Sequence, residues 1–263
     1  MKISKLVEKT LLRAWLAVKK PFCEEVLVLG DSHAAVFNHS LMRLKFGRYH
    51  LNVVSVGGAT ASGLENPNSK TQAFQRFKQA LATTRAEKVI VMLGEVDTGF
   101  VIWYRAGRSG VSVPEALEKA LLNYQRLLTE IKSLGLSPIC VSTPLPTIRD
   151  GSDKGKIANE RKSISASQRE RTKLTLRFNR EMERFCCSEG IVYINLDADS
   201  LGSDGLVKAE LLNRNALNHH YEKRTFARML SGRVSHVVKA PSGNGTGMRS
   251  TQPQPRAAPW RAP

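Results

Sequence analysis

The residues best suited to chemistry stand directly after short apolar segments of the chain. Gly30, Asp31, Ser32 and His33 follow the apolar residues 26–29. A strand that ends at a glycine and leaves a serine at the start of a helix places that hydroxyl at the carboxyl edge of a sheet, beside helix N–H groups without intrahelical partners. A serine hydroxyl in that place suits a nucleophile, and the N–H groups suit the stabilisation of an oxyanion.

Three further segments carry residues of the same kind. They are Val56-Gly57-Gly58-Ala59-Thr60, Gly94-Glu95-Val96-Asp97 and Asn218-His219-His220-Tyr221. The first two follow predicted strands, where glycine lets the backbone approach a ligand closely. The third precedes the last predicted helix and supplies imidazoles that could accept a proton.

These segments are positioned by alternating short apolar and longer amphipathic stretches, which is typical of parallel strands joined by crossover helices. The predicted strands are 26–29, 51–56, 88–93, 138–142 and 191–196. The predicted helices are 33–44, 71–83, 114–134, a long one ending near 187, and 220–233. Near-continuous apolar strands imply a sheet covered on both faces, so we expect an α/β fold, a three-layer α/β/α sandwich with a five-stranded parallel sheet. Ligands of such folds bind beyond the carboxyl ends of the strands.

One domain, residues 23–236, accounts for this pattern. Residues 1–22 read as a basic amphipathic segment, either packed on the domain or making weak contact with a membrane surface. Arg13 interrupts its apolar stretch, and neither a signal peptide nor a transmembrane segment is apparent, so we expect a cytoplasmic protein. Residues 237–263 are rich in Ser, Gly, Pro, Gln and Arg, which predicts a disordered basic tail.

The formal net charge of +17 is unevenly spread: residues 1–20 carry +5, residues 239–263 carry +4, and the remaining +8 lies between them. No RNP, zinc-finger or helix-turn-helix signature accompanies it, so we do not expect a nucleic-acid partner. The same positive charge would attract an acidic glycan, an anionic lipid or an acidic partner. The four cysteines show neither a disulfide framework nor a CxxC spacing. We expect a reducing compartment and no metal site, because the adjacent Cys186 and Cys187 are poorly placed to share one ion with the late histidines.

The serine, the glycine turn, the Gly-x-x-Asp turn and the late histidines, in this order, resemble the SGNH or GDSL hydrolase family over about Val26 to Leu230. The resemblance implies a flavodoxin-like sheet and a serine esterase that needs no cofactor. It makes Ser32 the nucleophile and an oxyanion donor, with Gly58, or alternatively Gly57, as a second donor. It also implies a small-molecule or glycan ester as substrate, and an O-acetylated carbohydrate is the preferred class.

Two positions depart from the family pattern. Val96 stands where the third block normally has an oxyanion-binding Asn, which resembles a GDSH subgroup with a Gly-Glu-(Ile/Val)-Asp block. Polar side chains that could then support the site are Asp31, Glu95, Asp97 and Arg105. The Asp expected three residues before the histidine is replaced by Ala216 or Leu217, so Asn215, Asp204 or a backbone carbonyl would have to orient the base. Both His219 and His220 are candidate bases, and we favour His219.

Each motif can also be interpreted as purely structural. Asp31 or Ser32 could simply cap a helix, His33 could be a packing residue, and the histidine pair could cap the last helix. Because of the two departures, the alternative function is a catalytically impaired module of the same fold that binds an acylated glycan without hydrolysing it.

Overall fold

A computed structural model describes residues 23–151, 164–215 and 217–239 of the 263-residue chain. The predicted N-terminal segment 1–22 and residues 240–263 of the predicted tail lie outside the described residues.

A five-stranded sheet lies at the centre of this domain, and all of its neighbouring strands pair in parallel. The strand order across the sheet is β2-β1-β3-β4-β5. In chain order the strands are β1 (Glu24–Gly30), β2 (Tyr49–Ser55), β3 (Lys88–Met92), β4 (Ser137–Val141) and β5 (Val192–Ile194). All five strands were predicted from the sequence, with ends that differ by a few residues.

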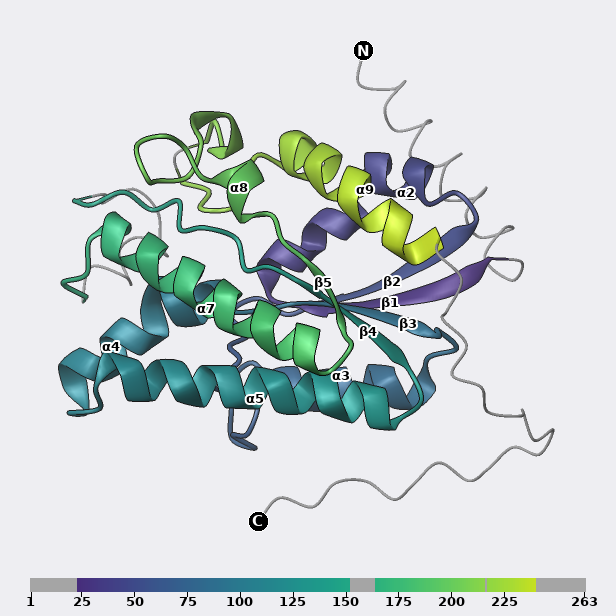
Figure 1. Cartoon of the computed structure of the whole chain (residues 1–263), viewed down its shortest axis with the longest axis horizontal. Helices are drawn as coiled ribbons and strands as arrows, with labels where there is room; N and C mark the ends of the chain where they lie inside the picture. The colour runs from purple at the N-terminus through teal and green to yellow at the C-terminus, as the bar shows by residue number, and fades with distance from the viewer. Residues whose placement is uncertain (1–22, 152–163, 216, 240–263) are drawn as a thin grey trace.

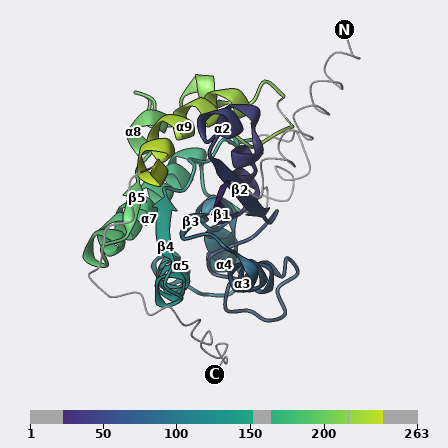
Figure 2. The same ribbon diagram turned by 90° about the vertical axis from the view of Figure 1, so that its right-hand side faces the viewer.

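Helices cover both faces of the sheet (Figures 1 and 2). On one face lie α3 (Ala73–Thr83), α4 (Ile102–Arg108), α5 (Val113–Ser133) and α7 (Gln168–Ser188). On the other face lie η2 (Ser32–Asn38), α2 (Ser40–Lys45), α8 (Asp197–Ser200) and α9 (Lys223–Lys239). The short segments η3 (Asp97–Val101) and η4 (Ala209–Leu211) complete the described elements. The predicted three-layer α/β/α fold is therefore confirmed.

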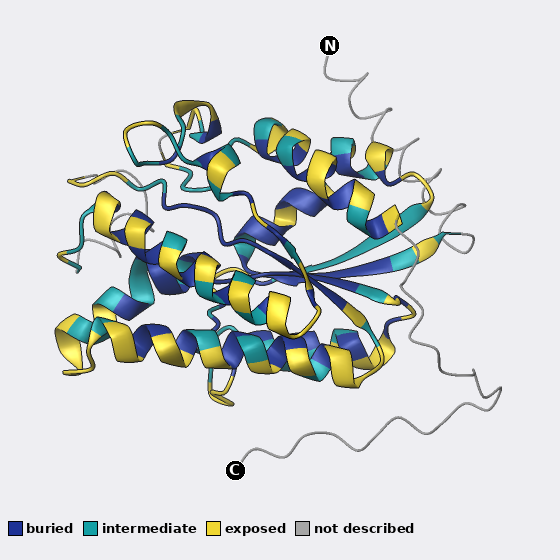
Figure 3. Cartoon of the chain, viewed as in Figure 1, coloured by how far each residue is buried: buried dark blue, intermediate teal, exposed yellow. Residues whose placement is uncertain are grey.

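The inner strands β1, β3 and β4 are mainly apolar because their successive side chains point to opposite faces that are both covered. The edge strand β2 is only half-buried and also carries His50 and Asn52. In β1, Leu27 and Leu29 belong to the core beneath α3, α5 and α7, whereas Val26 and Val28 belong to the core beneath η2, α2 and α9. All four side chains are at most 1% exposed. Figure 3 shows the same pattern, with a buried sheet and helices whose exposed faces point outward.

The prediction of one continuous helix over 33–44 is wrong, because the structure has two separate helices there, η2 and α2. His39 interrupts it with an extended backbone (φ −67°, ψ 146°), and its imidazole accepts a hydrogen bond from the N–H of Leu41. Such side-chain capping ends one helix and starts another, an effect that apolar periodicity does not reveal.

The last helix was predicted over 220–233, but α9 runs from Lys223 to Lys239. Val234 and Val238 lie one helical turn apart and are both buried in the core, which stabilises the additional turns. Residues 237–239, assigned to the tail from their sequence, are therefore helical. η3 and α4 were not predicted.

Gly30, at the end of β1, leaves no space for a side chain between β3 and η2. A Cβ atom added there would lie 2.3 Å from the carbonyl oxygen of Met92 and 2.7 Å from the Cβ of Ala34. We therefore expect Gly30→Ala to lower the free energy of unfolding in urea by about 1–3 kcal/mol, the usual cost of overpacking. Gly107→Ala is the matched control, because a Cβ at Gly107 meets no atom within 4 Å. Equal stability of the two variants would refute this interpretation.

Candidate active site

The turn that carries Ser32 is shaped by the residues on either side of it. Asp31 is the N-cap of η2, and its carboxylate accepts a hydrogen bond from the N–H of His33 (2.9 Å). The N–H of Asp31 donates to the carbonyl oxygen of Met92 at the end of β3 (3.2 Å). Ser32 is consequently the first residue of η2, half-buried, at the carboxyl end of β1.

The late histidines approach this turn from the far end of the chain. The ring centroids of His33 and His220 are 4.7 Å apart, and those of His219 and His220 are 4.1 Å apart. Nδ1 of His33 lies 3.3 Å from Oδ1 of Asp31. His33, His219 and His220 thus form one histidine cluster beside the Ser32 turn. Nε2 of His220 has no hydrogen-bond partner among the described residues, so the Ser32 hydroxyl does not bond this nitrogen.

Asn218 orients the imidazole of His220. Its Oδ1 accepts a hydrogen bond from the N–H of His220 (3.1 Å) and lies 2.8 Å from Nδ1 of the same residue. Because a backbone N–H can only donate, the shared atom is the amide oxygen, and Nδ1 carries the proton in this contact. Nε2 then has the free lone pair; it is buried and has no hydrogen-bond partner within the described residues. This is the tautomer that a general base needs.

The surroundings keep His220 neutral. Burial, followed by the charges of His33 and His219, lowers its pKa to about 3, while the carboxylate of Glu95 acts in the opposite direction. Glu95 is itself only 2% exposed and follows β3, so the carboxyl ends of β1 and β3 bring their polar side chains to the same region. Near pH 7 the imidazole of His220 is available to accept a proton.

The sequence did not single out Asn218, although an Asn two residues before the bonded N–H is the spacing of an Asx turn. Two residues that were considered as orienting groups act in local turns instead. Oδ1 of Asn215 accepts from the N–H of Leu217, and Oδ1 of Asp204 accepts from the N–H of Leu206. Ala216 lies outside the described residues.

The glycine turn after β2 lies beside the Ser32 turn because two hydrogen bonds tie the strands together there. The hydroxyl of Ser55 donates to the carbonyl oxygen of Asp31 (2.8 Å), and the N–H of Val56 donates to that of Gly30 (2.9 Å). Gly57 and Gly58 follow and are both exposed. Gly58 has a φ of +73°, a conformation that favours glycine.

Asp97 fastens the loop that continues from the glycine turn. Its buried carboxylate accepts hydrogen bonds from the N–H groups of Ala61 (2.7 Å) and Ser62 (3.0 Å). Burial raises the pKa of Asp97 to about 6, although these hydrogen bonds and the charge of Arg105 act against the shift. Asp97 therefore positions backbone at the site. Val96, half-buried next to it, has no polar side chain to offer.

Among the described residues, no group of three or more His, Cys, Asp or Glu side chains is arranged to hold a metal ion. The four cysteines are free thiols; Cys140 and Cys186 are buried, while Cys187 is exposed.

Solved structures with a similar fold include a GDSL-like lipase and an acetyl xylan esterase. A GDSL-like lipase from Bacteroides thetaiotaomicron superimposes with a TM-score of 0.57 at 12% sequence identity, over 86% of this chain and 96% of the lipase. An acetyl xylan esterase superimposes with a TM-score of 0.54 at 13% identity, over 81% of this chain and 99% of the esterase. No protein-family model and no curated protein sequence matches the chain. The three-layer sandwich is thus the fold of the SGNH, or GDSL-type, hydrolases.

None of the helices in the described ranges is both long and apolar enough to span a lipid bilayer.

We expect Asp97→Ala to leave two buried N–H groups, those of Ala61 and Ser62, without an acceptor. Each buried N–H group without an acceptor destabilises the fold by about 1–3 kcal/mol. Removal of the carboxylate also removes the cost of burying its charge, which offsets part of this loss. The free energy of unfolding in urea should therefore fall by about 2 kcal/mol. A loss below about 0.5 kcal/mol would mean that the carboxylate does not support the loop.

The lowered pKa of His220 makes the stability of the fold dependent on pH. Between pH 6.5 and about 3, the unfolded chain binds a proton at His220 that the folded chain does not bind, so folding is disfavoured as the pH falls through this window. The raised pKa values of Asp97 and Asp197, both about 6, give the opposite slope. The contribution of His220 is therefore isolated by comparing the wild type with His220→Gln.

Between pH 7 and pH 4.5, we expect the melting temperature of the wild type to fall further, or rise less, than that of His220→Gln. Parallel melting temperatures across this range would show that the folded chain does not hold His220 in its neutral form.

Proposed function

We propose that the chain is a serine esterase of the SGNH type, in which Ser32 attacks the acyl carbonyl of an ester. The observation that carries this proposal is the meeting of the Ser32 turn, the glycine turn and the histidine cluster at the carboxyl ends of β1, β2 and β3. The similarity of the fold to lipases and esterases supports the reaction class.

His220 is the better candidate for the base, with His219 as the alternative. Its Nδ1 is held by Asn218, and its Nε2 has a lone pair without a partner in the described part of the chain. The proton of the Ser32 hydroxyl passes to Nε2 as the oxygen attacks, and then to the departing alcohol. A water molecule then attacks the acyl-enzyme and gives a proton to the same nitrogen. As the bond between the acyl carbon and the Ser32 oxygen breaks, this proton passes to the Ser32 oxygen, and the carboxylic acid is released. The Ser32 hydroxyl must approach Nε2 when substrate binds, as catalytic hydrogen bonds often tighten only then.

Backbone N–H groups would hold the oxyanion. Ser32 is the first residue of η2, where N–H groups have no intrahelical acceptor, and the exposed Gly58, or Gly57, offers another N–H beside it. Val96 supplies no side-chain donor. Loss of one such donor costs about 10²- to 10³-fold in rate in a studied protease, so we expect slow turnover.

The substrate that we propose is an O-acetyl ester of a carbohydrate. The similarity to an acetyl xylan esterase and the exposure of the glycine turn favour an acyl group on a hydrophilic alcohol. The mechanism uses only side chains and backbone of this chain.

A fluorophosphonate probe tests the nucleophile. We expect it to modify Ser32 in the wild type and not in Ser32→Ala, because only an activated hydroxyl displaces fluoride from phosphorus. Release of acetate from acetylated xylan oligosaccharides should fall at least 10³-fold in the same variant. Ser133→Ala is the control, since the exposed Ser133 hydroxyl only bonds the carbonyl oxygen of Glu130.

Equal labelling of the wild type and Ser32→Ala would exclude Ser32 as nucleophile. Binding of the acetylated oligosaccharide that is unchanged in Ser32→Ala, with no acetate released by either protein, would instead identify a binding module.

A further inference from the structure

The chain segment after β4 connects the histidines to helix α7. We call residues 143–150 the strap. The N–H of Leu145 donates to the hydroxyl oxygen of Tyr221 (2.7 Å), and the hydroxyl of Thr147 donates to the carbonyl oxygen of His219 (2.5 Å). The strap thus binds the residues on both sides of His220.

The opposite side of the strap is bound by the first turn of α7. Nε2 of Gln168 donates to the carbonyl oxygen of Pro146 (2.9 Å), and Nη2 of Arg171 donates to that of Ile148 (2.7 Å). From Leu145 to Ile148, the odd-numbered residues therefore contact the histidine segment and the even-numbered ones contact α7. This is the alternation of an extended chain, in which successive groups point to opposite sides. A shift of the strap by one residue would break both sets of bonds. Thr143, at the start of the strap, is bonded to Asn179 of α7.

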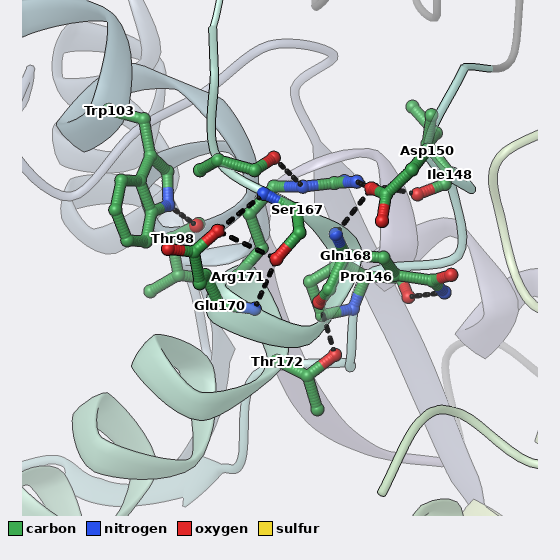
Figure 4. A network of polar contacts seen from close by, with 11 residues as sticks. Thr98, Trp103, Pro146, Ile148, Asp150, Ser167, Gln168, Glu170, Arg171 and Thr172 are labelled. Atoms are coloured by element: carbon green, nitrogen blue, oxygen red, sulfur yellow. Dashed lines mark hydrogen bonds and ion pairs between the residues drawn. The ribbon is translucent and has the colours of Figure 1, made fainter. Parts of the chain in front are cut away.

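Arg171 holds the strap in this register. The residue is only 3% exposed, and its guanidinium also donates from Nε to the carbonyl oxygen of Ala166 (3.3 Å) and from Nη2 to Oδ1 of Asp150 (3.3 Å). Figure 4 shows these contacts, with the N–H of Gln168 meeting the same carboxylate. A buried guanidinium is costly unless its donors are satisfied, so the strap cannot leave it freely.

We propose that Arg171 is a positioning residue for the histidine base: through the strap, it fixes where His219 and His220 lie relative to Ser32. The inference rests on the proposed esterase function for its kinetic consequence, whereas the geometric link from Arg171 to the histidines is independent of it. The link from Arg171 to the histidines runs through its bond to the carbonyl oxygen of Ile148 in the strap and the bond of Thr147 to His219.

The test replaces Arg171 with lysine, which keeps the charge but cannot bond several carbonyl groups in a fixed plane. Two quantities are measured on the full chain: the ¹H–¹³C imidazole resonances of His219 and His220, and kcat and KM for p-nitrophenyl acetate. We expect Arg171→Lys to move both sets of resonances and to lower kcat about 10- to 100-fold with KM nearly unchanged, because displacement of a catalytic group chiefly affects the chemical step. Arg177→Lys, an exposed change on the same helix, is the control.

A second substitution tests whether the effect travels through the strap. Thr147→Val removes the hydroxyl that binds His219 while keeping the side-chain shape; Thr83→Val, at an exposed helix position, is its control. Thr147→Val cuts the link between the strap and His219, so a further change at Arg171 should then have less effect on the histidines. We therefore expect Arg171→Lys to move the imidazole resonances of Thr147→Val by less than about half as much as it moves those of the wild type, because the effects of coupled sites are not additive. If Arg171→Lys does not fold, Gln168→Leu takes its place, because it removes the bond from Nε2 of Gln168 to the carbonyl oxygen of Pro146.

Unchanged imidazole resonances in a folded Arg171→Lys or Gln168→Leu protein, or equal displacements with and without Thr147→Val, would overturn the proposal. If the wild type shows no Ser32-dependent hydrolysis, the esterase function fails, yet the resonances still decide whether Arg171 positions the histidines.

Discussion

The carboxyl end of β1 is held between its two neighbouring strands, and the candidate site takes its shape from that constraint. The N–H of Asp31 bonds the end of β3, while Ser55 and Val56 at the end of β2 bond the backbone of Asp31 and Gly30. Because β1 is buried on both faces, it cannot shift without exposing apolar side chains on both sides of the sheet. A polar turn is thereby fixed at the end of an apolar strand.

Polar groups are buried around this turn at considerable cost. The structure reduces that cost by keeping the imidazole of His220 neutral and by providing backbone N–H groups as donors to buried acceptors. Burial lowers the pKa of His220 to about 3 and raises that of Asp97 to about 6, so both shifts favour uncharged forms. Asp97 and Asn218 each accept two hydrogen bonds, and each of them fixes one of the segments that meet at Ser32. Catalysis of ester cleavage would use the same preorganisation.

Much of this arrangement could be predicted from the sequence, since apolar strand residues and glycines at strand ends depend on local pattern. The five strands were predicted, and their parallel topology collects the carboxyl ends of the strands at one edge. The late histidines lie against His33, the neighbour of Ser32, which strand periodicity alone does not predict. The division of the predicted helix at His39 and the orientation of His220 by Asn218 were not predicted. Both depend on local hydrogen bonds from side chains to the backbone, which apolar periodicity does not reveal. The anchoring by Arg171 depends on contacts between distant segments, and its basic surroundings in the sequence suggest a solvated helix face.

The crystal structure of the chain with a phosphonyl group bound to Ser32 would test the central claim most directly, because the phosphonyl oxygen occupies the place of the oxyanion. We predict that this oxygen lies about 2.7–3.1 Å from the N–H groups of Ser32 and of Gly58 or Gly57, and that an imidazole nitrogen of His220 or His219 lies within about 3.2 Å of the Ser32 oxygen. A phosphonyl oxygen that meets only solvent, with both imidazoles beyond hydrogen-bonding reach of Ser32, would contradict the account.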